Sequence, residues 1–155
     1  MKDAELLAEL LQEEQELQFE AFSNELALRI GCRIAEVARQ DNLAVTVDIR
    51  RNGHQLFHYA SAGTSADNDE WVLRKSRVTD RFGHSSYYME VLLRSIGQTL
   101  QQRFLLEPSH YAAYGGAFPI LVKGVGPVGT ISVSEYPDDH RLVTSVIREF
   151  IRSEA

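Results

Sequence analysis

The spacing of apolar residues alternates along the chain between a helical repeat and a period of two, which predicts a mixture of helices and strands. Capping residues mark where several of the helices begin, and Gly97 is a weak point inside one of them. Helices are expected over about 3–13, from Ser23 or Asn24 to about 42, from Asp67 or Asn68 through Phe82, from Ser85 or Ser86 through Phe104, and after Pro137.

Two hairpins are predicted between these helices. The run 44–50 is rich in β-branched residues, a second strand follows at about 56–60, and Asn52-Gly53 between them is a strong turn signal. Strands near 118–123 and 128–134 form the second hairpin. Leu17, Phe19 and Ala21 alternate with polar residues, which indicates a further strand, although a continuous N-terminal helix is the alternative.

This order of elements predicts an α+β fold with a central antiparallel sheet of about five strands and helices packed on it. We expect one domain over residues 1–155, in which residues 1–14 form a peripheral amphipathic helix. That helix carries a leucine stripe and the exposed pair Glu13-Glu14, and its apolar stripe is expected to find a partner in another subunit.

Composition narrows the class of protein. The 155 residues are 44% apolar and 25% charged with a net charge of −6, which is typical of a soluble domain and argues against a broad nucleic-acid surface. No segment resembles a membrane span, and the acidic N-terminus is unlike a secretory signal, so we expect a cytoplasmic protein. The single Cys32 excludes an intrachain disulfide and is expected to be an inert, packed thiol.

Signatures of common enzymes are absent from the sequence. It has no nucleophile elbow, P-loop, dinucleotide fingerprint or zinc-ligand spacing. The five histidines form no metal motif, because His54 and His58 would stand roughly 13 Å apart on a strand. The catalytic residues are therefore unknown, and we predict no metal site.

Two residues are candidates for binding an anion. Lys75 falls at helical spacing from Trp71, Val78 and Phe82, so it is either a lysine whose ammonium reaches water past apolar neighbours or an anion anchor. His84 lies with two serines just before a helix, where backbone N–H groups favour negative charge, although helix capping alone also explains the serines.

The glycine-rich stretch from Gly115 to Gly129 is the most distinctive part of the chain. Glycines at this density mark either tight turns or places where a ligand approaches the backbone closely. Combined with the candidates above, they predict a ligand-binding pocket lined by Trp71, Lys75, His84, Gly115 and Gly116.

Several segments together resemble the family that groups GlcG, the haem-binding protein HbpS and the C-terminal domain of PduO, often described as haem-degrading. The most specific are Gly-Gly-Ala-Phe-Pro-Ile at 115–120, the strand 128–134, and Asp-Asp-His at 138–140. The segments 48–53, 67–75 and 82–88 are similar to a cytosolic branch of that family.

The resemblance implies a compact GlcG/HbpS-like α+β domain, assembled into homo-oligomers built from dimers, with haem or a corrinoid as the ligand in some relatives. This chain departs from the family pattern at Glu135, where relatives commonly have glycine. The early helices also contain no histidine, so haem ligation would need another residue such as His84 or His110.

Three functions are therefore compatible with the sequence. The first is an oligomeric small-molecule-binding module for haem, a corrinoid or a small anion. The second is a non-catalytic assembly or partner-binding protein. The third is an enzyme acting on a tetrapyrrole or small carbonyl compound, with Lys75 or His84 as its reactive group.

Overall fold

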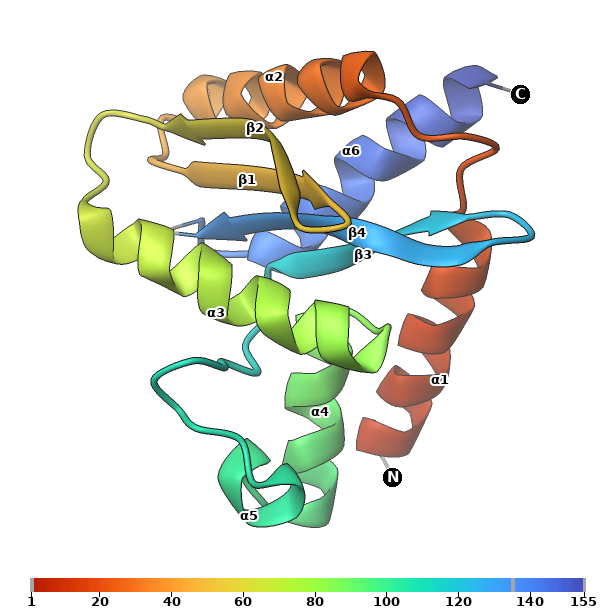
Figure 1. The fold of residues 1–155 in the computed structure, drawn as a ribbon, viewed down its shortest axis with the longest axis vertical. Helices are drawn as coiled ribbons and strands as arrows, with labels where there is room; N and C mark the ends of the chain where they lie inside the picture. The colour runs from red at the N-terminus through yellow and green to blue at the C-terminus, as the bar shows by residue number, and fades with distance from the viewer. Residues whose placement is uncertain (1, 135, 155) are drawn as a thin grey trace.

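The computed structural model describes residues 2–134 and 136–154. Glu135, whose effect on the turn after Ser134 was in question, lies outside them. The elements in chain order are α1 (Lys2–Glu16), α2 (Asn24–Gln40), β1 (Thr46–Arg51), β2 (His54–Ala60), α3 (Ala66–Phe82), α4 (Ser86–Ile96), α5 (Leu100–Phe104), β3 (Ala117–Val122), β4 (Gly126–Ser134) and α6 (Asp139–Glu154) (Figure 1).

The sheet has four antiparallel strands in the order β2-β1-β4-β3, not the five expected. Both hairpins form as predicted, and Asn52 and Gly53 turn the first with φ of 51° and 80°. The expected strand at 17–21 is reduced to a single parallel bridge between Phe19 and Val122. Leu17 and Phe19 are buried there while Ala21 is exposed, so the period of two does not continue.

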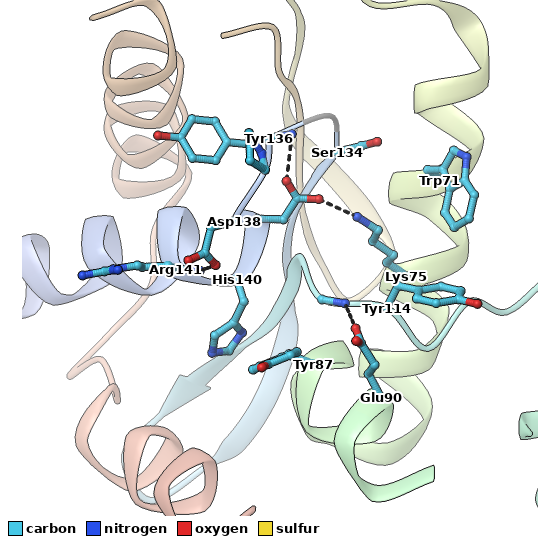
Figure 2. A pocket seen from close by; sticks show the side chains of 13 residues that line it. Trp71, Lys75, Tyr87, Glu90, Tyr114, Ser134, Tyr136, Asp138, His140 and Arg141 are labelled. Atoms are coloured by element: carbon cyan, nitrogen blue, oxygen red, sulfur yellow. Dashed lines mark hydrogen bonds and ion pairs between the residues drawn. The ribbon is translucent and has the colours of Figure 1, made fainter. Parts of the chain in front are cut away.

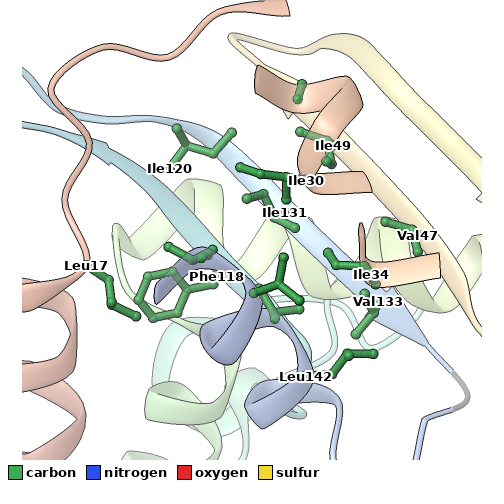
Figure 3. Close-up of a cluster of buried hydrophobic side chains, with 14 of the residues drawn as sticks. Leu17, Ile30, Ile34, Val47, Ile49, Phe118, Ile120, Ile131, Val133 and Leu142 are labelled. Atoms are coloured by element: carbon green, nitrogen blue, oxygen red, sulfur yellow. The ribbon is translucent and has the colours of Figure 1, made fainter. Parts of the chain in front are cut away.

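Helices cover the sheet on both sides. Helices α2 and α6 pack on one face, and α3 packs on the other (Figure 1). The main core lies between the sheet and α2 with α6, where alternate residues of β1 and β4 point inward (Figure 3). Its fully buried members include Ile30, Ile34, Val47, Ile49, Phe118, Ile120, Ile131, Val133, Val143 and Ile147.

The α3 face of the sheet is polar. Thr130 donates to Asp80 at 2.6 Å, Ser132 donates to the Val72 carbonyl at 3.1 Å, and Asn68 donates to Ser134 at 3.3 Å. The face of α3 that packs on β4 is therefore largely polar, and the ammonium of Lys75 is buried beside it.

A second, smaller core joins α3 to α4, α5 and the irregular segment after them. The helix expected to run from 85 to 104 is divided at Gly97, which takes a left-handed φ of 67° and ends α4. Thr99 then caps the short α5. The buried members of this core are Val78, Met89, Leu93, Leu100 and Leu106.

Helix α1 packs against α4 within the same chain. The Glu14 carboxylate pairs with His84 at 2.7 Å and accepts the Ser85 N–H at 3.2 Å, while Glu13 pairs with His140 at 2.7 Å. Glu14 is only 5% exposed, so the expectation of an exposed Glu13-Glu14 pair was wrong. The apolar stripe of α1 therefore packs within its own chain and gives no support for an interface between subunits. Assembly into homo-oligomers stays a prediction.

A buried ion pair connects α3, β4 and α6 at the end of the sheet. The Lys75 ammonium donates to Asp139 at 2.8 Å and to the Val133 carbonyl at 3.1 Å. Gly116 lies directly against this pair: a Cβ there would stand 2.6 Å from the Val133 oxygen and 2.8 Å from Lys75 Nζ. Its φ of 136° also disfavours any side chain, so this close approach requires glycine.

Cys32 is exposed on α2, so the expectation of a packed thiol was wrong. In the part of the chain that the structure describes, no helix is both long and apolar enough to cross a membrane.

We predict that Gly116→Ala lowers the free energy of unfolding by about 3 kcal/mol, because the added methyl group combines backbone strain with disruption of a buried ion pair. Gly124→Ala is the matched control. Its φ is 77°, but nothing lies within 4 Å of the added Cβ, so it is expected to cost only about 1 kcal/mol. Equal losses in urea unfolding would show that the ion pair tolerates the methyl group.

We also predict that the stability supplied by His84 depends on pH. The hydrogen bond to Glu14 raises the pKa of His84 above its usual value of 6.5, although partial burial opposes this. The stabilisation is therefore complete below pH 6.5 and is lost as pH rises through the raised pKa. Because His84 is partly exposed, the effect is expected to stay below about 1 kcal/mol.

Urea unfolding of the wild type and of His84→Gln at pH 5.5 and 8.5 measures this contribution. The substitution should destabilise the protein more at pH 5.5 than at pH 8.5. His54→Gln, at an exposed position on β2, serves as the control and should show a smaller difference between the two pH values. A loss in His84→Gln that is larger at pH 8.5 would overturn the prediction.

Candidate functional site

A pocket of about 690 Å³ opens where α3, α4, the segment before β3 and the start of α6 meet (Figure 2). Segments far apart in the sequence supply its walls. The lining residues are Trp71, Lys75, Tyr87, Glu90, Tyr114, Gly115, Ser134, Tyr136, Pro137, Asp138, Asp139, His140 and Arg141.

Aromatic rings form one side of the pocket. Trp71 lies one turn before Lys75 on α3, and Tyr114 contacts it edge to face with the ring centroids 5.9 Å apart. The Arg74 guanidinium lies 4.1 Å from the centre of the Trp71 ring and donates to the Pro108 carbonyl at 3.1 Å. The indole therefore already binds one cation from its own helix.

Helix α4 contributes Tyr87 and Glu90 from adjacent turns. The Glu90 carboxylate accepts the backbone N–H of Gly115 at 2.9 Å, which holds the glycine segment against α4. A Cβ on Gly115 would stand 3.3 Å from the Tyr87 ring, so the close packing of this segment favours glycine.

The ion pair of Lys75 and Asp139 forms the floor of the pocket. Lys75 is 5% exposed, so its ammonium does not reach bulk water as a snorkelling lysine would. Asp139 uses its other oxygen to accept the Tyr136 N–H at 2.8 Å. The cation that was predicted to anchor an anion is therefore already neutralised by a carboxylate of the same chain.

The start of α6 forms the rim. Asp138 is exposed, and its carboxylate accepts the Arg141 N–H at 3.3 Å, as an N-terminal capping residue does. The Tyr136 hydroxyl hydrogen-bonds to Asp41, and this bond with partial burial raises the pKa of Tyr136 to about 12. The phenol therefore stays protonated at neutral pH.

The structure brings together most of the predicted site residues. Trp71, Lys75 and Gly115 line one pocket, and Gly116 supports it from behind through its contact with Lys75. His84 is not among the lining residues. It instead holds α1 through Glu14 and contacts Tyr88 with the ring centroids 4.6 Å apart.

Three further residues line the pocket that were not predicted from the sequence: Tyr87, Glu90 and Tyr114. Tyr87 and Glu90 lie off the apolar stripe of α4. Because they are three residues apart, their spacing could have predicted that both lie on the same second face of the helix. Tyr114 directly precedes the glycine pair in a segment without periodicity, so only its position in the chain pointed to it.

A second pocket of about 650 Å³ lies between α2 and β2, with Cys32, Phe57 and Tyr59 among its lining residues. It contains none of the predicted site residues, and we therefore place the candidate site at the first pocket.

Comparison with known proteins identifies relatives along nearly the whole chain. A family model described as haem degrading protein HbpS-like matches residues 22–148. A UPF0303 protein of Streptomyces coelicolor is 43% identical over 150 residues, covering 96% of this chain and 95% of the relative. A UPF0303 protein of Edwardsiella ictaluri is 45% identical over 153 residues, covering 97% and 98%.

Solved structures share the fold. The crystal structure of the Ybr137w protein has a TM-score of 0.89 and 29% identity, and the match covers 96% of this chain and 88% of that one. HbpS has a TM-score of 0.67 at 21% identity, covering 85% and 92%. A complex of PduOC with haem has a TM-score of 0.69 at 15% identity, covering 83% and 94%. The family match and the UPF0303 relatives confirm the predicted resemblance: the chain belongs to the HbpS-like family.

Proposed function

We propose that this protein is a non-catalytic small-molecule-binding module and that its ligand site is the pocket floored by Lys75 and Asp139. The observation that carries the proposal is that four separate segments meet there around a cavity. Trp71, Lys75 and Gly115, which were predicted from the sequence as pocket residues, all line it. Pockets of a few hundred cubic ångströms that combine aromatic walls with a few polar groups are typical ligand sites.

The side chains favour binding over catalysis. Schiff-base chemistry needs a lysine amine that can attack a bound carbonyl, whereas the Lys75 nitrogen donates to Asp139 at 2.8 Å and to the Val133 carbonyl at 3.1 Å. The other sequence candidate, His84, lies outside the pocket lining. Neither residue offers a reactive group to a molecule bound there.

Haem is named in the family description and is bound in the PduOC complex, so it is the first ligand to compare with the residues of this pocket. The one histidine among the lining residues is His140. Its Nε2 pairs with Glu13, and its Nδ1 is buried without a hydrogen-bond partner among the described residues. Glu90 and Asp138, the lining carboxylates that Lys75 does not neutralise, would also repel haem propionates. The described pocket therefore does not fit haem held by histidine.

A ligand screen tests the proposal. Trp71 is the only tryptophan in the chain, so its indole N–H gives one assignable NMR signal at the pocket wall. We expect hits from a fragment library of mixed charge to shift this signal, and Tyr114→Ala to weaken their binding by about tenfold. Tyr59→Ala, in the pocket between α2 and β2, is the control and should leave their affinities unchanged. Hits that shift only signals around α2 and β2, or an absence of hits, would refute the proposed site.

We predict that a haem titration gives no Soret shift that depends on a histidine of this region. The spectra of the wild type, His140→Ala and His84→Ala should coincide, because the Nδ1 of His140 is buried and His84 lies outside the pocket lining. The circular dichroism of each variant checks that it is folded. A Soret band of the wild type that disappears in either folded variant would establish the haem-binding alternative.

A further inference from the structure

The charges that line the pocket are unbalanced. Its carboxylates are Glu90, Asp138 and Asp139, and its permanent cations are Lys75 and Arg141. Lys75 and Asp139 neutralise each other at 2.8 Å. Arg141 is exposed, and its side chain extends away from Trp71 and Lys75 (Figure 2). The aromatic side of the pocket therefore carries the negative charge of Glu90, and no lining cation is paired with this carboxylate among the described residues.

Glu90 is positioned to accept a further hydrogen bond. One carboxylate oxygen binds the Gly115 N–H at 2.9 Å, and the other has no hydrogen-bond partner among the described residues. Arg94, one turn further along α4, is paired with Asp3 of α1 at 3.0 Å. Arg94 thus makes its hydrogen bonds to Asp3, although its charge also attracts Glu90, and the half-buried Glu90 carboxylate faces the cavity.

The rings around Glu90 suit a cation. Trp71, Tyr87 and Tyr114 line the same cavity as the carboxylate, and Tyr114 is 58% exposed. The faces of tryptophan and tyrosine attract organic cations, and aromatic cages are the usual recognition device for substituted ammonium groups. The Arg74 guanidinium already lies over Trp71 at 4.1 Å, so Tyr87 and Tyr114 are the rings left to attract the ammonium of a ligand.

From this arrangement we infer that the pocket selects small organic cations, with an ammonium group bound by Glu90 and a flat or aliphatic body packed against Trp71 and Tyr114. The inference rests on the proposed function, and it replaces the anionic ligand suggested by Lys75 in the sequence. Asp139 has already neutralised that lysine, so an anion would instead meet the Glu90 carboxylate, which forms no ion pair among the described residues.

Three probes of nearly equal size and different charge test this choice: benzylamine, which is a cation at pH 7, neutral benzyl alcohol, and the benzoate anion. Binding is followed by the fluorescence of Trp71, the only tryptophan. We expect saturable binding of benzylamine that is at least about tenfold tighter than that of benzyl alcohol and weakens as salt is added, with benzoate weakest.

Glu90→Gln identifies the group responsible. The amide oxygen can still accept the Gly115 N–H, so the variant should fold, keep its binding of benzyl alcohol and lose the preference for benzylamine. Glu36→Gln removes a carboxylate from the other pocket and should keep the preference. Urea unfolding of both variants verifies that they are folded.

The outcomes separate this inference from the proposed function. Tighter binding of benzoate or benzyl alcohol, with a saturable change at Trp71, would overturn the cation inference and leave the pocket as a ligand site. A benzylamine preference that survives in Glu90→Gln would also overturn it. If none of the three probes changes the Trp71 fluorescence and the fragment library yields no hits at the pocket, the cation inference and the proposed function both fail.

Discussion

The buried ion pair of Lys75 and Asp139 determines how the helices meet at one end of the sheet. Lys75 projects from α3, Asp139 is the first residue of α6, and the Val133 carbonyl belongs to β4, so one ammonium joins three elements. Breaking a buried ion pair by removing one partner leaves an uncompensated charge that costs several kcal/mol. The backbone must also approach this pair at Gly116, where no side chain fits. The arrangement is therefore strongly constrained.

The pocket is a direct consequence of that constraint. Once Lys75 is fixed on α3, Trp71 lies one helical turn away and faces the same cavity. Once Gly116 is held against the ion pair, Gly115 is placed within reach of Glu90 on α4. Asp139 in turn sets the start of α6, which forms the rim. A contact that stabilises the fold thus also supplies the floor of the candidate site, so substitutions of Lys75 are expected to change stability and any binding there together.

Local signals in the sequence predicted most of the fold. The Asn52-Gly53 turn and the caps at Ser23 and Ser85 act within a few residues, so they are visible in one sequence. The failures concern contacts between distant segments. Lys75 and Asp139 are 64 residues apart, so the sequence around Lys75 does not indicate which residue pairs with it. The strand expected around Phe19 shrank to one bridge, because tertiary packing and not local periodicity decides pairing at a sheet edge.

The same distinction applies to the site. Lys75 was predicted because it is a cation at helical spacing from apolar residues such as Trp71, and Gly115 because glycines are dense around it. The structure places all three around one cavity. Whether this cavity holds the ligand is tested most directly by a crystal structure of the protein with benzylamine. We predict an ammonium within hydrogen-bonding distance of Glu90 and an aromatic ring against Trp71 and Tyr114. Benzylamine bound between α2 and β2 instead, with this cavity occupied only by solvent, would contradict it.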